Sequence, residues 1–485
     1  MSMEGQTQMR KSTNPRNNQP TTAKKRGFSG RTRIILIAAP ILLACIAVAV
    51  VLILRIRRDQ APDQITITYA NWNLGPNHDN ALELRMLQSF MDDNPHINVV
   101  VDTSVTLPWM DGLAAAATNA RLPDVFMVDD LGATAANGWL MDLTSIAWTD
   151  ADFFDLSPHI RETVLINHAV YALPFAKDIH GYFINRDLFR ALGVDVPSFG
   201  ISPEGFFDAV RQTTNFAHPS IGINSTFAFV DWYPGAANPH LGFFAFDGLS
   251  FALNSPEMLN AIRNAADIYH GGYAFLNLDE TTRSSYFPIG YDLGAFRNGQ
   301  MAFFYGGSWL MGFMLTQVDF DWDFIGVPGG RSIVAMEIIG VYANTDHPEE
   351  AYKLAQWMGH STEGNLRRLQ YAQEMGITPN VLPASQNSQV LGTLWQTIPA
   401  QGFAQVYGAM DRALIDGRRV LPGYMQARYS APTGVTIEGT AHINAGIDPL
   451  INYSITGDIN FEDHSQMAED IARQQLEAAQ ERLVR

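Results

Sequence analysis

Hydrophobic positions after residue 64 switch repeatedly between two periods. Short runs of β-branched and aromatic residues predict buried strands, whereas apolar residues spaced three and four apart predict amphipathic helices. The predicted order is a strand at residues 65–69, a helix at 81–91, a strand at 97–102, a helix at 112–120 and a strand at 123–128. Strands that alternate with helices in this way predict a parallel sheet with helices on both faces, which is an α/β fold.

The α/β pattern continues through the rest of the chain, with residues that mark helix ends. Asn185 is placed to cap a helix that Gly193 closes, and Ser202 begins another helix. Further predicted elements are a strand at 303–305, a helix at 309–315, a helix that opens at 346–349 and an amphipathic helix at 465–483. We expect residues 231–234, DWYP, to lie in a loop between such elements.

Residues 34–54 form an uncharged apolar run of 21 residues. As a helix this run would span roughly 31 Å, the thickness of the hydrocarbon core of a bilayer, so we expect a transmembrane anchor. Eight Lys and Arg residues precede the run and three follow it closely, which predicts a cytoplasmic N-terminus and an extracytoplasmic main domain. Residues 1–33 are polar and basic and are expected to form a disordered cytoplasmic tail, with residues 55–64 as a linker.

The single cysteine, Cys45, lies inside this apolar run and leaves a second interpretation open. Residues 42–45, LLAC, resemble the cleavage box of a bacterial lipoprotein, in which Cys45 would be lipidated. The apolar run continues for nine residues beyond Cys45, and this length favours an uncleaved anchor. In either case the main domain contains no cysteine, so we expect its fold to form without disulfides.

The charge of the chain is strongly asymmetric. Residues 1–58 hold eleven of the 32 basic residues and a single acidic residue, Glu4. The remaining residues therefore carry 21 basic against 48 acidic side chains, although the whole chain has a net charge of −17. A body this acidic repels phosphate backbones, which argues against nucleic-acid binding and favours neutral or cationic ligands.

Signatures of common enzymes and cofactor sites are missing from the sequence. There is no G-x-G-x-x-G, no G-x-x-x-x-G-K-[ST] and no H-E-x-x-H. The twelve histidines do not fall at metal-ligand spacings. We therefore expect neither a cofactor nor a metal ion, and a protein that binds its ligand rather than converting it.

Aromatic, amide and acidic side chains instead gather near the predicted ends of strands, where open α/β sheets bind ligands. The candidates are Trp72 and Asn73 after the first strand, Asp130 after the third, Tyr305 and Trp309 around a Gly-Gly break, and Trp232 and Tyr233 in the predicted loop. Flat rings stack on the C–H faces of sugars, while Asp and Asn hydrogen-bond hydroxyl groups. The set therefore predicts a neutral polyhydroxylated ligand, although any single ring in it could instead be a packing residue.

The stretch at 171–189, YALPFAKDIHGYFINRDLF, carries a resemblance to a known family. Its YALP and YFINRDLF segments are similar to the Y-x-L-P strand and the Y-Y-N-K-D-L-F segment of family 1 extracellular solute-binding proteins. Further similar segments lie at 296–302, 307–309, 339–341, 347–351 and 378–384. Their order and spacing indicate that about residues 62–485 resemble this family, the maltose-binding-like receptors of ABC sugar importers.

The resemblance implies a two-lobed, periplasmic-binding-protein-like fold that closes on its ligand about hinge strands. The implied boundaries are residues 65–178 and 342–395 for lobe 1, and residues 179–341 and 396–485 for lobe 2. The chain would cross between the lobes near 177–184 and return near 334–342. Lys177, Asp178 and Glu337 would then lie at the cleft, which makes them candidate ligand contacts, or they could belong only to the hinge.

The resemblance also implies a function: capture of a sugar or oligosaccharide and its delivery to the permease subunits of an ABC importer. Most members are cleaved or lipidated at the N-terminus, whereas this chain is expected to keep its membrane anchor. A ligand-sensing receptor subunit of a signalling system is therefore a second interpretation. A third is a membrane-anchored glycoside-processing enzyme that uses Asp130 and Glu337 as a carboxylate pair.

Overall fold

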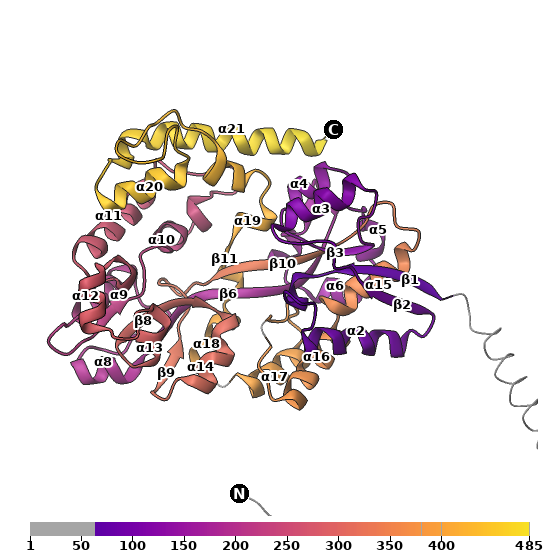
Figure 1. The fold of residues 1–485 in the computed structure, drawn as a ribbon, viewed down its shortest axis with the longest axis horizontal. Coiled ribbons are helices and arrows are strands. Elements are labelled where there is room, and N and C mark those ends of the chain that lie inside the picture. The colour runs from indigo at the N-terminus through magenta and orange to yellow at the C-terminus, as the bar shows by residue number, and fades with distance from the viewer. Residues whose placement is uncertain (1–63, 380, 399, 485) are drawn as a thin grey trace, which may run out of the picture. The chain divides into compact units, whose positions relative to one another are not determined.

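The computed structural model describes residues 64–379, 381–398 and 400–484 (Figure 1). The tail and the apolar run expected at residues 1–33 and 34–54, and all but the last residue of the linker, lie outside this part of the chain. Within the described part, no helix combines the length and the apolar character needed to cross a membrane.

The first strands of the described chain form a parallel edge of the sheet, as predicted. β1 (Ile65–Ala70) pairs in parallel with β2 (Ile97–Val101) and with β3 (Val125–Val128). α2 (Ala81–Asp93) and α3 (Trp109–Thr118) connect these strands. The spacing that predicted α2 also fixes which of its side chains are buried in the core: Leu82, Met86, Leu87 and Phe90.

A single sheet extends through both lobes in the strand order β2-β1-β3-β10-β6-β8-β7. At its centre β6 (Leu173–Asn185) pairs antiparallel with β10 (Ile333–Val341), and both strands run across the middle of the molecule in Figure 1. They contain nearly all of the two crossing segments implied by the family resemblance. The two-lobed α/β architecture is therefore confirmed, with β6 and β10 as the strands that join the lobes.

Short helices and a small hairpin complete lobe 1. The hairpin consists of β4 (Leu165–Ile166) and β5 (Ala169–Val170). The helices are α4 (Leu131–Ala136), α5 (Thr144–Ala147), α6 (Ala151–Asp155), α7 (Pro158–Glu162), α15 (Pro348–Met358), α16 (Thr362–Met375) and α17 (Ser388–Thr397).

Lobe 2 continues the sheet with β8 (Met301–Gly307), β7 (Ile221–Ile223) and β9 (Trp322–Phe324). Its helices are α8 (Arg186–Leu192), α9 (Pro203–Gln212), α10 (Phe229–Ala237), α11 (Pro256–His270), α12 (Glu280–Tyr286), α13 (Asp292–Arg297) and α14 (Met311–Gln317). The predicted caps are confirmed, since Asn185 accepts a hydrogen bond from the Leu188 amide and Gly193 ends α8 in a left-handed conformation. The helix predicted at 309–315 begins as a 3-10 turn and becomes α-helical at Met311.

Residues 231–234 lie within α10, so the loop predicted for DWYP is wrong. Pro234 lacks the amide that would continue the helical ladder, and this favours a loop when the sequence is read locally. Phe229 and Trp232 are nevertheless fully buried in the aromatic core of lobe 2. Burial of these large rings outweighs the local cost of the proline.

The end of the chain returns over the sheet to both lobes. After α18 (Gln401–Gly408), β11 (Leu414–Ile415) pairs in parallel with β10, and α19 (Gly417–Val420) packs on β10. A π-helical turn (Gln426–Ser430) and α20 (Ile447–Thr456) lead to α21 (Ser465–Val484). α21 packs against both the π-helical turn and α4 of lobe 1, and Figure 1 shows it reaching across the top of the molecule.

Candidate functional site

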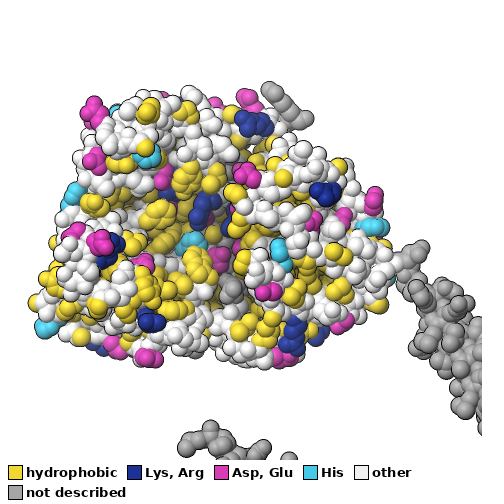
Figure 2. All heavy atoms as spheres, in the orientation of Figure 1, with side chains coloured by type: hydrophobic (Ala, Val, Ile, Leu, Met, Phe, Trp, Pro, Cys, Tyr) yellow, Lys and Arg dark blue, Asp and Glu magenta, His cyan; other side chains and the backbone are white. Residues whose placement is uncertain are grey.

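A cleft lies between the two lobes and is formed by two adjoining cavities of about 490 and 200 Å³. Both cavities are lined by His180 of β6, Trp309 of lobe 2 and Arg418 of α19. Figure 2 shows a hollow between the two halves of the molecule, where charged and histidine side chains meet hydrophobic ones. A combined volume of this size falls in the range of small-molecule sites.

The floor of the cleft comes from alternate residues of the two central strands. Asp178 and His180 of β6 line the cavity together with Ala335 of β10, which pairs with Asp178. Glu337 lies two residues further along β10, so its side chain leaves the sheet on the same face as Ala335. The pairing therefore places Asp178 and Glu337 diagonally across two neighbouring strands.

Lys177 points to the opposite face of β6 and does not line the cleft. Its side chain is fully buried, and the ammonium lies 4.1 Å from the ring centroid of Tyr407. Its backbone forms hydrogen bonds with the backbone of Leu382. Burial lowers the pKa of Lys177 to about 7. Of the two residues predicted at the crossing, only Asp178 is therefore positioned to meet a ligand.

Burial has opposite effects on the two ionisable residues of the cleft floor. Burial and the nearby Glu337 carboxylate raise the pKa of Asp178 to about 7, while Arg419 and the Ser308 hydroxyl oppose this shift. Burial also lowers the pKa of His180 to about 4, so its imidazole is neutral at pH 7. The floor therefore offers a carboxyl group that exchanges its proton near neutral pH beside a neutral ring.

Trp72, Asn73 and Glu337 form one hydrogen-bonded cluster on the lobe 1 side. The Trp72 indole donates to one oxygen of Glu337 at 3.1 Å, and the Asn73 amide donates to the other at 2.6 Å. The guanidinium of Arg419 lies 5.1 Å from the Trp72 ring. Because Arg419 lines the cleft, this cluster stands directly behind the cavity wall rather than in it.

Asp129 and Asp130 both line the cleft at the end of β3. Asp130 caps α4 by accepting a hydrogen bond of 2.9 Å from the Ala133 amide, and burial raises its pKa. Asp129 lies 3.5 Å from the Nε of Arg419. The predicted strand-end position of Asp130 is therefore in the cleft, where its carboxylate also organises the start of a helix.

Aromatic rings form the lobe 2 wall of the cleft. Trp309 and Phe227 expose 46% and 55% of their surfaces there, and Tyr305 and Tyr429 lie beside them. The ring of His180 meets Trp309 edge-on at 5.0 Å. Rings that remain exposed inside a concave site are available to stack on a flat ligand.

Trp232 and Tyr233 lie elsewhere, and neither lines the cleft cavities. Trp232 is fully buried in lobe 2, and its indole donates to the Tyr182 hydroxyl at 3.1 Å. Tyr233 packs against Phe207 in the same core. Their predicted role followed from the loop expected at 231–234, and it is lost with that loop because α10 turns both rings inward.

The sequence reading missed the segment 416–429, which closes the cleft from above the sheet. Arg418 donates to Asp416 at 2.7 Å, and Arg428 donates to Asp231 at 2.6 Å. The adjacent arginines at 418–419 in an acidic body were the available signal. The sequence of this segment predicts neither a strand nor a long helix. Its position depends instead on packing against β10 and α21.

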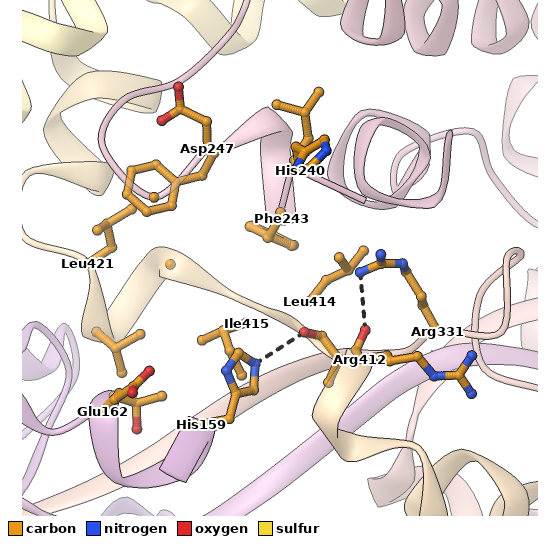
Figure 3. Close-up of a pocket in the computed structure, with 18 of the residues that line it drawn as sticks. His159, Glu162, His240, Phe243, Asp247, Arg331, Arg412, Leu414, Ile415 and Leu421 are labelled. Carbon is orange, nitrogen blue, oxygen red and sulfur yellow. Dashed lines mark hydrogen bonds between the residues drawn. The ribbon is translucent and has the colours of Figure 1, made fainter. Parts of the chain in front are cut away.

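A separate cavity of about 500 Å³ lies outside the cleft, beside the segment 416–429. It is lined by α7 of lobe 1 and residues 239–251 of lobe 2 (Figure 3). Figure 3 shows His159 and Leu414 on one side of this cavity and His240 and Phe243 on the other. Its rings Phe243 and Tyr424 are almost wholly buried. None of the ligand contacts predicted from the sequence lines it, so the first cleft is the better candidate for a stacking ligand.

Comparison with known proteins relates this chain to a family. Residues 85–395 match the family model described as bacterial extracellular solute-binding protein. No curated protein matches the chain in sequence. The matched residues include both central strands and the lobe 1 wall of the cleft, but not the segment 416–429.

Several solved structures share the fold over most of both chains. An ABC substrate-binding protein from Listeria monocytogenes in complex with cycloalternan is 21% identical with a TM-score of 0.64, covering 85% of this chain and 99% of that one. The cyclic α-maltosyl-1,6-maltose binding protein from Arthrobacter globiformis is 19% identical with a TM-score of 0.62, covering 86% and 100%. The GacH receptor of Streptomyces glaucescens, solved unliganded and with acarbose, is 16% identical with a TM-score of 0.60, covering 85% and 99%.

Proposed function

Because this chain belongs to the bacterial extracellular solute-binding proteins, we propose that it captures a sugar or oligosaccharide between its lobes and delivers it to an ABC importer. The observation that carries this proposal is the cleft itself, where the exposed ring of Trp309 lines the same cavity as the carboxyl groups of Asp130 and Asp178, and the exposed ring of Phe227 lines the adjoining cavity. Stacking faces opposite planar hydrogen-bonding groups suit a polyhydroxylated ring. The complexes of the Listeria protein with cycloalternan and of the GacH receptor with acarbose, which share the fold, support this ligand class.

Binding in the proposed mechanism couples to closure of the lobes. A sugar that stacks on Trp309 of lobe 2 would reach the strand-end carboxylates of lobe 1 only when the lobes approach. Contacts with both walls favour the closed state by the difference in affinity between the closed and open forms. β6 and β10 join the lobes, so small backbone changes in these strands would suffice for the motion.

In the proposed arrangement the apolar run at 34–54 anchors the receptor to the cell membrane, with the N-terminus in the cytoplasm. Tethering would hold the receptor near its permease, and a signalling partner would be served by the same geometry. The variant Cys45→Ser separates this arrangement from lipidation. An uncleaved anchor predicts that the variant stays in the membrane fraction with unchanged mass, whereas release or a mass change would indicate a lipoprotein.

A thermal-shift and calorimetric screen of the protein against mono- and oligosaccharides tests the proposed function. A ligand present at 100 times its Kd should raise the free energy of unfolding by about 2.7 kcal/mol. Trp309→Ala should weaken binding of the best sugar by roughly 1–2 kcal/mol, since one stacked ring is removed. Trp148→Ala, which removes a half-exposed indole of lobe 1 outside the cleft, is the control and should bind normally.

Two results would contradict the proposal. Absence of a shift with every sugar would count against a carbohydrate ligand. Turnover of a glycan would support the glycosidase interpretation instead. For a binding protein we expect no turnover, because Glu337 already accepts hydrogen bonds from Trp72 and Asn73 and Asp130 already caps α4.

A further inference from the structure

We propose that the cleft selects a ligand with a positive charge, an amino sugar, and that Asp178 is the main determinant of this preference. The inference rests on the proposed function, because it names a subclass of carbohydrate for the same cleft. It follows from which charged groups around the cavity have partners and which do not.

The guanidinium groups around the cleft already have carboxylate partners within the protein. Arg418 pairs with Asp416, and Arg428 pairs with both Asp231 and Asp448. A guanidinium held in this way has little unbalanced charge to offer an anionic ligand. Arg419 is less tightly held, since its contact with Asp129 is 3.5 Å long.

Three carboxyl groups at the same cleft have no basic partner among the described residues. Asp178 accepts one long hydrogen bond of 3.3 Å from the Ser308 hydroxyl. Asp130 accepts from a backbone amide, and Glu337 accepts from an indole and a side-chain amide. All of these donors are neutral. Together with Asp129 they make four carboxyl groups, and Arg419 is the basic residue that interacts with two of them, Asp129 and Asp178.

Asp178 is the member of this group that lines the cavity with only one long hydrogen bond to the protein. It lines the cavity on the central strand, whereas Glu337 stands behind Arg419. Four neighbours face Asp178 or border it: Glu337 from β10, Arg419 from α19, Ser308 from the turn before α14, and neutral His180 on β6. Only one of these neighbours carries a positive charge.

An ammonium group supplies the missing charge where a hydroxyl does not. The interaction of two unit charges about 4 Å apart at a protein surface is of order several times that of a neutral hydrogen bond. The exposed ring of Trp309 in the same cavity and that of Phe227 in the adjoining one add faces that attract cations. Both walls of the cleft are therefore suited to a sugar ring that carries an ammonium group.

The charge balance predicts a proton change on binding. Burial and Glu337 raise the pKa of Asp178 to about 7, so part of the free protein carries a proton there at pH 7. An ammonium that settles beside Asp178 favours its ionised form. Binding of an amino sugar at pH 7 should therefore release a fraction of a proton from Asp178, and a neutral sugar should not.

The experiment compares sugars that differ only at one substituent. The probes are glucosamine and its β-1,4-linked dimer and trimer, against glucose, cellobiose and cellotriose, measured by calorimetry at pH 7 in two buffers of different ionisation enthalpy. We expect the amino sugars to bind at least about tenfold more tightly, which corresponds to ~1.4 kcal/mol. We also expect their measured heats, but not those of the neutral sugars, to depend on the buffer.

Conservative variants test whether Asp178 causes the preference for amino sugars. Asp178→Asn keeps the shape of the side chain and should reduce the preference for amino sugars to about twofold or less, because the affinity for amino sugars should fall by more than the affinity for neutral sugars. Asp411→Asn removes the same charge from an exposed position outside the cleft and should leave the preference intact. Thermal unfolding of each variant shows whether it is folded.

The outcomes separate the inference from the function on which it rests. Equal or tighter binding of the neutral sugars would overturn the inference and leave the proposed function standing. A preference that survives in Asp178→Asn would overturn the role of Asp178. Failure of every sugar, charged or neutral, to bind would contradict the proposed function as well.

Discussion

Lys177 and Asp178 are neighbours in β6, yet their side chains enter different surroundings. Asp178 lines the ligand cleft and accepts a hydrogen bond from Ser308. Lys177 is sealed on the other face of the strand under the ring of Tyr407. One strand thus carries an acid on its functional face and a base on its structural face, each with a pKa of about 7.

The difference shows that burial alone does not identify a functional residue. Burial lowers the pKa of Lys177 and raises that of Asp178, because in each case it disfavours the charged form. What separates the two is the cavity on one face and the protein core on the other. A shifted pKa on this strand therefore indicates a functional residue only where the ionisable side chain lines a cavity.

The largest expected effect comes from replacing Lys177 with Met. A buried ammonium without a hydrogen-bond partner among the described residues should cost free energy, and an apolar side chain of similar length should relieve it. We expect Lys177→Met to raise the free energy of unfolding by about 3 kcal/mol at pH 6, measured by urea denaturation. Lys353→Met, at an exposed position of α15, is the matched control and should change little.

The sign of the pH dependence sharpens this prediction. The folded-state pKa of about 7 lies below the model-compound value of 10.5, so between these values the unfolded chain binds more protons than the folded one. Stability of the native protein should therefore rise with pH from about 7 to 10 through this group. The advantage of Lys177→Met should shrink over that interval, and an advantage that is independent of pH would show that Lys177 is not the cause.

The next largest effect is the opposite pH dependence on the cleft face. The pKa of Asp178 is raised from 3.8 to about 7, so its contribution to stability is fully present below pH 4 and is lost as the pH rises to about 7. Asp178→Asn should remove this decline, which we expect to be about 2 kcal/mol between pH 4 and 7. The measurement is a urea midpoint series over that range beside Asp411→Asn, and parallel curves for all three proteins would contradict it.

Lys177 and Asp178 also show how much of the site could be predicted from the sequence. The family resemblance predicted a crossing between lobes within the stretch 171–189, and the structure has β6 over most of this stretch. Period-two geometry separates Lys177 from Asp178, but it cannot tell which face becomes the cleft. That choice depends on Tyr407, whose ring covers the Lys177 ammonium and lies more than 200 residues away in sequence.

The remaining differences have the same origin in long-range packing. The proline in 231–234 predicted a loop, and the aromatic core of lobe 2 turned it into a helix. Arg418 and Arg428 enter the cleft because the segment between them is held by β10 and α21. Local pattern therefore predicted the strands and the caps, and the family resemblance pointed to Asp178, while the position of the closing segment above the floor could come only from the folded chain.

The smallest expected effect tests what covers Lys177. Tyr407 presents its ring to the ammonium and donates its hydroxyl proton to the Pro383 carbonyl. Tyr407→Phe removes only that hydrogen bond, so we expect a loss of about 1 kcal/mol that does not vary between pH 6 and 10. Tyr407→Leu also removes the buried ring, which adds a packing cost at every pH, and the total loss should be larger at pH 6, where Lys177 is charged and attracted to the ring, than at pH 10. Urea denaturation of both variants at the two pH values would show this, and equal pH profiles would mean that burial alone, without the ring, sets the state of Lys177.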